Sequence, residues 1–250
     1  QHQDGHSHII SATVPNIISY DPTFAYELGV IIQEGIKRMY VDQESIYYYL
    51  TLQNEDYAMP PMPNGCREGI LKGIYKYQGS TVKRAKATAN LLGSASLFQY
   101  AAKAKEILED KYKVACNLFS VTSYNELRRD GLDIDRYNLL NPTKKAKKAF
   151  VAETLDGEGD VTISVSDYMK ALGDGIRKWV PQPFTVLGTD GFGRSETRDV
   201  LRDFFEIDER YIVIATLGAL ADQGKVEKKV VADAIKEFGI NPDKPNPRLV

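Results

Sequence analysis

Apolar and polar positions in the first sixty residues follow the order strand, helix, strand. Residues 17–20 form a short apolar run that ends at Asp21-Pro22, a pair typical of a helix start, with Asp21 as the N-cap. Apolar residues then recur at helical spacing to about Tyr40, and residues 46–52 form a tyrosine-rich run of strand type. This order predicts one unit of a parallel sheet.

A proline-rich segment, residues 59–65, interrupts the pattern. It holds three prolines within four positions, which exclude both a helix and a central strand. We therefore expect a domain boundary here, with one domain in residues 1–61 and a second in residues 62–250. Because proline-rich chain is stiff, it would hold the two domains at a fixed separation.

Beyond this boundary, strand patterns alternate with helix patterns. The strand patterns cover residues 87–92, 114–121, 161–165 and 184–187. Such alternation predicts an α/β domain with an open, mostly parallel sheet. From residue 195 to residue 238 the pattern becomes helical and predicts three helices, the second over 209–223 and the third over 228–238. The polar tail, residues 241–250, is a candidate docking segment for a partner.

The helices between these strands have their own start and stop signals. Gly93-Ser94 precedes a helix with an apolar face, and Ser123 with Glu126 forms a capping box. The helix that follows Ser123 is expected to end at Gly131. Another helix is expected to start at Ser166-Asp167 and to run through Leu172.

Composition limits the class of protein. The chain has 43% hydrophobic and 26% charged residues, which is typical of a globular protein, and its net charge of -2 offers no basic surface for nucleic acid. No apolar run reaches 18 residues, so the sequence does not predict a membrane span. Cys66 and Cys116 lack a CxxC spacing and favour a reducing compartment, which we take to be the cytoplasm. The chain starts at glutamine, so we expect it to be a piece of a longer protein.

All three histidines lie within the first eight residues, at His2, His6 and His8. An imidazole titrates near pH 7, so these side chains next to Asp4 and the flexible Gly5 are candidates for acid-base chemistry. Two other interpretations stay open at this stage. A polar terminus is often disordered, and this spacing could also bind a stray transition metal.

Two glycine-rich segments are less specific. Gly173-Asp174-Gly175 matches the start of the magnesium and diphosphate motif of thiamine-diphosphate enzymes, but the paired asparagines of that motif are missing, which favours a helix stop. The segment 188–195 contains three glycines after a predicted strand. At the carboxyl end of a sheet it is either a structural or subunit-contact turn, which we favour, or a ligand-binding loop.

Several segments together resemble the carboxyl-terminal part of a known family, the homodimeric bacterial pyruvate dehydrogenase first component. They are Asp4-Gly5-His6-Ser7-His8-Ile9, Ile18-Ser19-Tyr20-Asp21-Pro22, Met59-Pro60-Pro61-Met62-Pro63, Gly73-Ile74-Tyr75-Lys76, Ser166-Asp167-Tyr168-Met169, Leu187 to Ser195 and Asn246-Pro247-Arg248-Leu249. The resemblance implies an open, mostly parallel sheet of the transketolase carboxyl-terminal type. It also implies that the last strand-helix-strand unit of a pyrimidine-binding domain precedes this sheet.

The resemblance further implies a function and a set of partners. Members of this family decarboxylate pyruvate with thiamine diphosphate and magnesium, bound mainly by residues absent from this chain, and reductively acetylate lipoyl groups. The implied partners are pyruvate, the lipoyl domain and core of dihydrolipoyl acetyltransferase, and a second copy of the subunit. The position that matches the family's active-centre histidine is His2. In the wider transketolase family, the positions that match Asp4 and His8 face the substrate.

Three functions stay open at this stage. The chain could be the catalytic fragment just described, or a non-catalytic module for dimerisation or partner docking. A transketolase would need arginines to recognise a sugar phosphate, and Arg194 is the only candidate in a glycine-rich loop. Because the cofactor motif is missing, we expect the 250 residues alone to be inactive and not to hold the cofactor.

Overall fold

The computed structural model describes residues 4–250, so the predicted site residue His2 lies outside the described residues. The larger part of the molecule is built on a five-stranded sheet with the strand order β3-β5-β4-β6-β7. Strands β4 to β7 pair in parallel, while β3 at one edge runs antiparallel to β5. The strands are β3 (Ile74–Gln78), β4 (Thr88–Gly93), β5 (Ala115–Val121), β6 (Val161–Val165) and β7 (Phe184–Leu187). The predicted open, mostly parallel sheet is confirmed.

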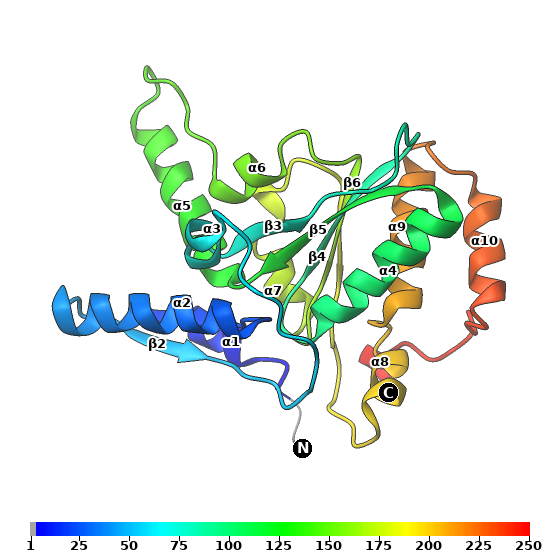
Figure 1. Cartoon of the computed structure of the whole chain (residues 1–250), viewed down its shortest axis with the longest axis horizontal. Helices are drawn as coiled ribbons and strands as arrows, with labels where there is room; N and C mark the ends of the chain where they lie inside the picture. Colours follow the sequence, from blue (N-terminus) through cyan, green and yellow to red (C-terminus); the bar gives the residue numbers. More distant parts are fainter. Residues whose placement is uncertain (1–3) are drawn as a thin grey trace.

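Helices cover both faces of this sheet, as Figure 1 shows. One face carries α4 (Leu97–Tyr112), α9 (Glu209–Asp222) and, outside α9, α10 (Lys228–Glu237). The other carries α5 (Tyr124–Leu140), α6 (Phe150–Leu155) and α7 (Lys170–Asp174). Neighbouring residues of a strand enter opposite cores: Leu91 packs under α4, whereas Leu92 packs under α5 and α6. This explains why the buried strands are apolar on both sides.

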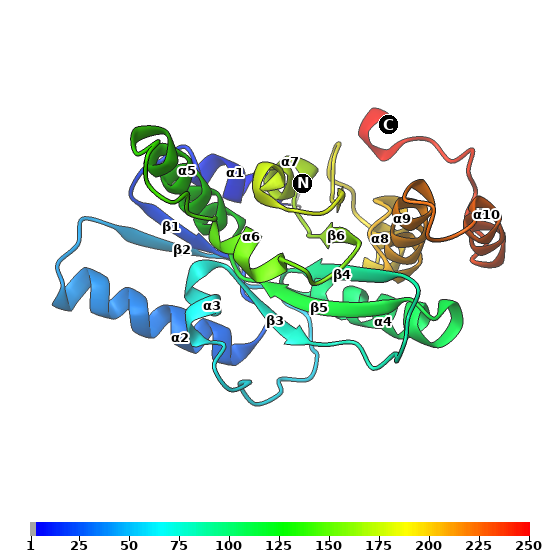
Figure 2. The same ribbon diagram turned by 90° about the horizontal axis from the view of Figure 1, so that it is seen from above.

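The first part of the described chain forms a smaller parallel pair, β1 (Ile17–Tyr20) and β2 (Tyr47–Leu50). Between these strands run α2 (Ala25–Ile36) and a π-helical turn, Lys37–Val41, so the predicted strand-helix-strand unit is confirmed. Figure 2 shows the pair between α2 on one side and α1 (Ser7–Ser11) with α5 on the other. Side chains of β1, α2 and α3 (Arg67–Lys72) form the core of this region.

Three predicted helix boundaries are wrong. The first helix begins at Ala25 rather than at Asp21-Pro22, because the carboxylate of Glu27 accepts hydrogen bonds from the backbone N–H groups of Thr23 (2.5 Å) and Phe24 (3.1 Å). Asp21 is buried instead, and its own backbone N–H donates to the carbonyl of Thr122 at 2.8 Å. The Asp21 side chain is therefore free for a different role.

The other two corrections concern packing that the local sequence does not show. Helix α5 continues through Gly131 to Leu140, because Gly131 lies against the indole of Trp179, where an added Cβ would come within 2.4 Å. Ser123 caps α5 as predicted, accepting from the backbone N–H of Glu126 at 3.0 Å, but the Glu126 carboxylate pairs with Arg129. The helix expected at Ser166-Asp167 starts only at Lys170.

The three helices expected near the carboxyl end are confirmed, beginning with α8 (Arg198–Phe204), and sequence reasoning missed β3, α1, α3 and α6. The polar tail ends in a 3-10 turn, Pro247–Leu249, that packs on this chain's own glycine-rich loop. At Gly191, which has a φ of +105°, an added Cβ would meet the carbonyl oxygen of Pro247 at 2.5 Å. The contact explains this glycine and supports the structural interpretation of segment 188–195.

Candidate functional site

Asp4 lies just before α1, and its carboxylate holds the backbone that leads into this helix. Asp4 accepts hydrogen bonds from the backbone N–H groups of His6 (3.1 Å) and Ser7 (2.9 Å), and also from the hydroxyl of Ser7. Partial burial acts to raise the pKa of Asp4, but the hydrogen bonds from Ser7 and His6 hold that pKa below its usual value. Asp4 is therefore an ionised, exposed carboxylate at neutral pH.

His8 has the opposite environment, since only 3% of it is exposed. Its ring lies edge-on to the rings of Tyr168, at a centroid distance of 4.7 Å, and Tyr49, at 5.5 Å. The ring nitrogen Nε2 lies 2.8 Å from the hydroxyl of Thr51. Burial lowers the pKa of His8 to about 4, so the imidazole stays neutral at pH 7. The expected titration near pH 7 is wrong for His8.

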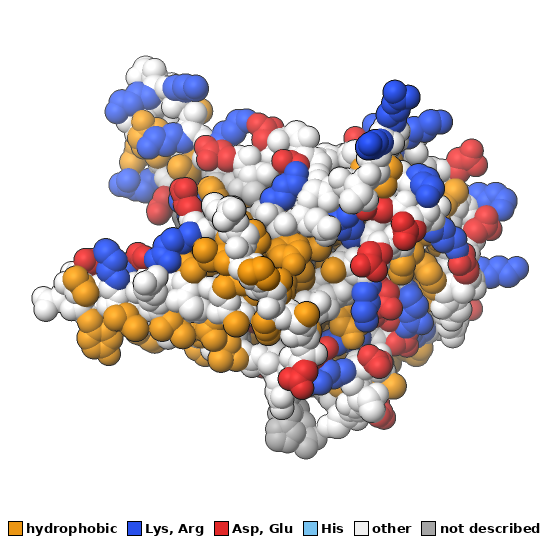
Figure 3. Space-filling model, viewed as in Figure 1, with side chains coloured by type: hydrophobic (Ala, Val, Ile, Leu, Met, Phe, Trp, Pro, Cys, Tyr) orange, Lys and Arg blue, Asp and Glu red, His pale blue; other side chains and the backbone are white. Residues whose placement is uncertain are grey.

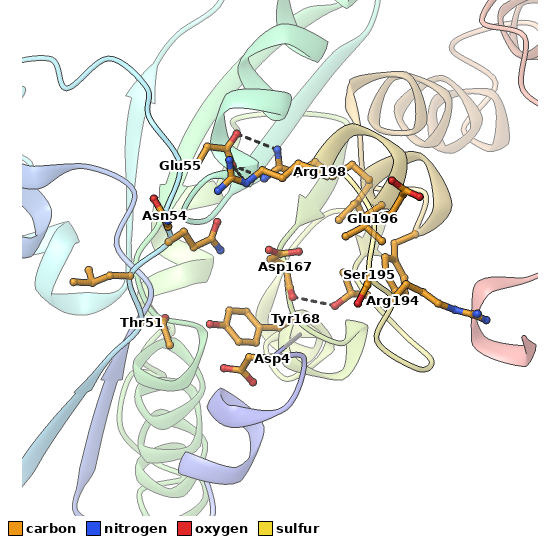
Figure 4. A pocket seen from close by; sticks show the side chains of 17 residues that line it. Asp4, Thr51, Asn54, Glu55, Asp167, Tyr168, Arg194, Ser195, Glu196 and Arg198 are labelled. Atoms are coloured by element: carbon orange, nitrogen blue, oxygen red, sulfur yellow. Dashed lines mark hydrogen bonds and ion pairs between the residues drawn. The ribbon is translucent and has the colours of Figure 1, made fainter. Parts of the chain in front are cut away.

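A cleft of about 590 Å³ opens beside Asp4. One wall is the segment 51–55, which follows β2, and the opposite wall is formed by residues 194–198 and α8. Asp167, Tyr168 and Thr189, just after β6 and β7, form the floor. In Figure 4 the hydroxyl of Tyr168 points toward Thr51, and Asp4 lies beside them. The cleft thus lies at the carboxyl ends of parallel strands, where α/β sheets bind ligands.

One side of the cleft is held by a buried ion pair. Arg202 on α8 donates to both carboxylate oxygens of Glu55, at 3.0 and 2.6 Å, to the hydroxyl of Tyr100 at 2.6 Å and to that of Ser96 at 2.9 Å. The guanidinium also lies over the ring of Tyr100, 4.4 Å from its centroid. Paired in this way, Arg202 fixes the wall and leaves little of its charge for a ligand.

The structure brings two predicted site residues to one place, because Asp4 lines the cleft and His8 lies directly behind it, against Thr51 and Tyr168. It does not bring the glycine-aspartate-glycine triplet there. Asp174 pairs with Arg177 near the end of α7, and an added Cβ on Gly173 would come within 2.7 Å of the side chain of Val186. The triplet is thus a packing feature of a helix end.

Sequence reasoning missed several cleft residues. Arg194, the arginine that it singled out, lies at the margin over the ring of Phe204 and points away in Figure 4, whereas Arg198 and Arg202 line the wall. Burial raises the pKa of Asp167, which lies two residues after the end of β6. That position at a strand end could have drawn attention to Asp167. Nothing local links Glu55 to Arg202, which is 147 residues away.

Comparisons with known proteins define the class. The family profile described as the transketolase-like TK C-terminal domain matches residues 73–208, and the profile of the pyruvate dehydrogenase E1 component middle domain matches residues 1–60. The match to the transketolase-like profile covers more than half of the chain, so the chain belongs to the family of transketolase-like carboxyl-terminal domains.

Two curated relatives make the assignment more specific. The pyruvate dehydrogenase E1 component of Escherichia coli K12 is 49% identical over 251 residues, which cover 100% of this chain and 28% of the relative. The corresponding protein of Pseudomonas aeruginosa is 48% identical over 248 residues, covering 99% of this chain and 28% of the relative. The resemblance found in the sequence is confirmed, and the chain spans little more than a quarter of these relatives.

Solved structures show the same fold at low identity. A transketolase from Pichia stipitis in complex with sedoheptulose 7-phosphate superposes with a TM-score of 0.61 at 14% identity, covering 90% of this chain and 28% of that one. A transketolase from Campylobacter jejuni gives a TM-score of 0.56 at 18% identity, covering 84% of this chain and 27% of that one. No helix within residues 4–250 is both long and apolar enough to cross a membrane.

Proposed function

We propose that this chain is the carboxyl-terminal part of a cytoplasmic pyruvate dehydrogenase first component. The complete subunit would decarboxylate pyruvate with thiamine diphosphate and magnesium and pass the acetyl group to a lipoyl group of the acetyltransferase. The observation that carries this proposal is the identity of 48 to 49% along virtually the whole chain. We further propose that residues 1–61 end a pyrimidine-binding domain and that residues 62–250 form the transketolase-like domain, in a subunit that pairs with a second copy.

The chain's own residues fit only one part of this chemistry. Within residues 4–250 no group of three or more histidine, cysteine, aspartate or glutamate side chains could hold a metal ion. The triplet Gly173-Asp174-Gly175, which matches the start of the magnesium and diphosphate motif, does not line the cleft, and Asp174 is paired with Arg177, so the triplet does not fit the magnesium and diphosphate end of the cofactor. We therefore expect the 250 residues alone neither to bind thiamine diphosphate tightly nor to turn over pyruvate. Isothermal titration calorimetry with thiamine diphosphate checks the binding directly.

Asp4 and His8, with His2, are the residues that we propose for the substrate side of the site. Decarboxylation and acyl transfer develop and lose negative charge on oxygen, which nearby hydrogen-bond donors stabilise. The lowered pKa of His8 supports the role of a neutral donor or acceptor rather than that of an imidazolium. The lowered pKa of Asp4 supports the role of an ionised acceptor at the mouth of the cleft.

A chimera tests this proposal. The matching segment of the Escherichia coli relative is replaced by this chain, and pyruvate turnover by the assembled enzyme is measured. We expect an active chimera whose kcat falls by about 10² to 10⁴ when His2, Asp4 or His8 is changed to Ala, the scale of an acid-base or hydrogen-bonding group at the reacting centre. Thr13→Ala is the matched control, since the Thr13 hydroxyl only donates to the carbonyl of Ile10 at the end of α1. Unchanged turnover in all three variants would contradict the assignment.

A second candidate function is non-catalytic self-association. It is supported by an apolar surface over α2, the turn that follows it and β2, orange at the lower left of Figure 3. Its exposed side chains are Ile32, Ile36, Tyr40, Val41 and Tyr47. If this surface pairs two copies, Tyr40→Lys shifts the chain from dimer to monomer in sedimentation equilibrium. A wild-type chain that stays monomeric at high concentration would exclude this function.

A further inference from the structure

The most unusual side chain near the candidate site is Asp21, which the sequence presents as an ordinary helix N-cap. It lies just after β1, where the β1–β2 unit meets the five-stranded sheet, and is only 5% exposed. Its oxygen Oδ1 accepts a hydrogen bond from the hydroxyl of Thr51 at 2.7 Å. Its other oxygen, Oδ2, makes no hydrogen bond within 3.5 Å among the described residues, although the buried hydroxyl of Ser94 lies near enough to lower the pKa of Asp21. A buried carboxylate that is only half satisfied is costly and calls for an explanation.

Thr51 connects this carboxylate to His8. Its Oγ1 lies 2.7 Å from Oδ1 of Asp21 and 2.8 Å from Nε2 of His8. A hydroxyl has one hydrogen to donate, so it can donate to only one of these two neighbours at a time. The Thr51 hydroxyl also lies 3.4 Å from the carbonyl oxygen of Tyr20 and close to the hydroxyl of Tyr168, which can donate to it. The two shortest contacts, to Asp21 and His8, favour a chain of hydrogen bonds in which Thr51 donates to one of these side chains and accepts from the other.

The direction depends on where the protons are. When Asp21 is ionised, Thr51 donates to Oδ1 and accepts from Nε2–H, so Nδ1 of His8 carries no proton. When Asp21 is protonated, a proton on Oδ1 has the Thr51 oxygen as an acceptor at 2.7 Å, whereas a proton on Oδ2 has only the nearby Ser94 hydroxyl, which makes no hydrogen bond within 3.5 Å, so Oδ1 is the favoured position. Asp21 then donates to Thr51, Thr51 donates to Nε2, and the ring proton of neutral His8 moves to Nδ1.

We propose that Asp21, acting through the Thr51 hydroxyl, sets which ring nitrogen of His8 carries the proton and is thereby a positioning residue for the candidate site. The proposal rests on the role proposed above for His8 and extends it to a residue that does not itself line the cleft. The tautomer matters because a neutral imidazole presents a donor at one nitrogen and an acceptor at the other. The protonation state of Asp21 thus determines whether Nδ1 of His8 is a hydrogen-bond donor or an acceptor.

The surroundings of Asp21 place its ionisation near pH 7. Burial raises the pKa of Asp21 to about 7, and the charges of Asp167 and Glu27 add to the increase, while the hydroxyls of Thr51 and Ser94 oppose it. The other titratable groups around it are the tyrosines Tyr57, Tyr124 and Tyr168, which burial keeps protonated. His8 itself stays neutral over this range because its pKa is about 4. A change of the His8 ring near pH 7 would therefore report Asp21.

Nitrogen NMR of the chain labelled with ¹⁵N-histidine tests this inference. Only three histidines contribute, and His2→Gln and His6→Gln identify the signals of His8. We expect both His8 ring nitrogens to change between the protonated and unprotonated type as the pH passes 7, without formation of imidazolium. The response should vanish in Asp21→Asn and in Thr51→Val, and return in Thr51→Ser, which restores the hydroxyl.

Two further variants sharpen the test. Asp167→Asn removes a neighbouring negative charge, so the midpoint of the response should move to lower pH while the response remains. Tyr49→Phe keeps the ring contact with His8 and should leave the response unchanged. Flat His8 signals between pH 5.5 and 8.5 in the wild-type chain, a response that survives Thr51→Val, or one that disappears in Asp167→Asn would each overturn the proposal. Since this measurement needs neither pyruvate nor cofactor, its failure is distinct from failure of the chimera.

Discussion

Two buried carboxylates only six positions apart, Asp21 and Glu27, occupy contrasting regions of the molecule. Both lie where the β1–β2 unit meets the five-stranded sheet, and burial raises the pKa of each. Around Glu27 every oxygen has donors: Oε1 accepts from the hydroxyls of Tyr75 (2.6 Å) and Ser120 (2.7 Å), and Oε2 accepts from two backbone N–H groups. Around Asp21 one oxygen has Thr51 and the other has no described partner.

The difference separates a structural carboxylate from one that can change state. The donors around Glu27 come from β3, β5 and the start of α2, so this side chain holds three elements in one arrangement. A complete network of this kind is rigid and specific. Asp21 has a single partner, and that partner also contacts His8. An incomplete network at the edge of a site leaves the carboxylate free to gain or lose its proton at little structural cost.

The largest expected effect is at Glu27. Glu27→Ala removes the acceptor for two hydroxyls and two backbone N–H groups, so it should lower the free energy of unfolding by roughly 3 to 5 kcal/mol. Urea denaturation at pH 7 measures this. Glu27→Gln keeps one carbonyl oxygen as an acceptor and should cost clearly less. A loss below about 1 kcal/mol for Glu27→Ala would show that the network is not structural.

A smaller effect of opposite sign is expected at Asp21. Because its folded pKa of about 7 exceeds the unfolded value of 3.8, the folded state binds more protons between these values, and stability falls as the pH rises from about 4 to 7. Asp21→Asn removes the buried charge, so it should stabilise the chain at pH 8 by on the order of 1 to 2 kcal/mol. Near pH 4 the gain should disappear.

Urea denaturation at several pH values separates this effect from a general change in packing. Thr216→Val is the control, because it removes a buried hydroxyl that donates to the carbonyl of Ile212 within α9, without removing a charge. Its effect on the free energy of unfolding should not depend on pH. A stabilisation by Asp21→Asn that is equal at pH 4 and pH 8 would contradict the raised pKa.

The smallest effect is expected at Asp4, an exposed carboxylate that caps a helix of five residues. Asp4→Ala should lower the free energy of unfolding by about 1 kcal/mol or less. Since the pKa of Asp4 is lowered in the folded state, its contribution is present at neutral pH and disappears as the pH falls below about 4. Thermal unfolding at pH 7 and pH 3 measures both values, with Asp4→Asn, which keeps an acceptor, as the control. A larger loss at pH 3 than at pH 7 would refute this sign.

Local sequence patterns were sufficient for elements that are buried on both faces or have clear caps. The four parallel strands and α8 to α10 were predicted because their apolar runs and stop signals are strong. The edge strand β3 was missed, because its exposed Lys76 and Gln78 interrupt the apolar pattern and its partner β5 is distant in sequence. The end expected at Gly131 failed because the reason for that glycine is Trp179, not a turn.

The same distinction between local patterns and distant contacts applies to the candidate site. The sequence by itself determined the family and the strand-helix-strand order, and it singled out the histidine segment as a candidate site, because short motifs and periodic patterns carry that information. Only the tertiary structure decided that His8 is buried and neutral, that Arg202 is paired with Glu55 and that Asp21 lies behind Thr51. A pKa and a hydrogen-bond direction depend on how far water is excluded and on which groups face each other across the fold, and residue order does not contain these quantities.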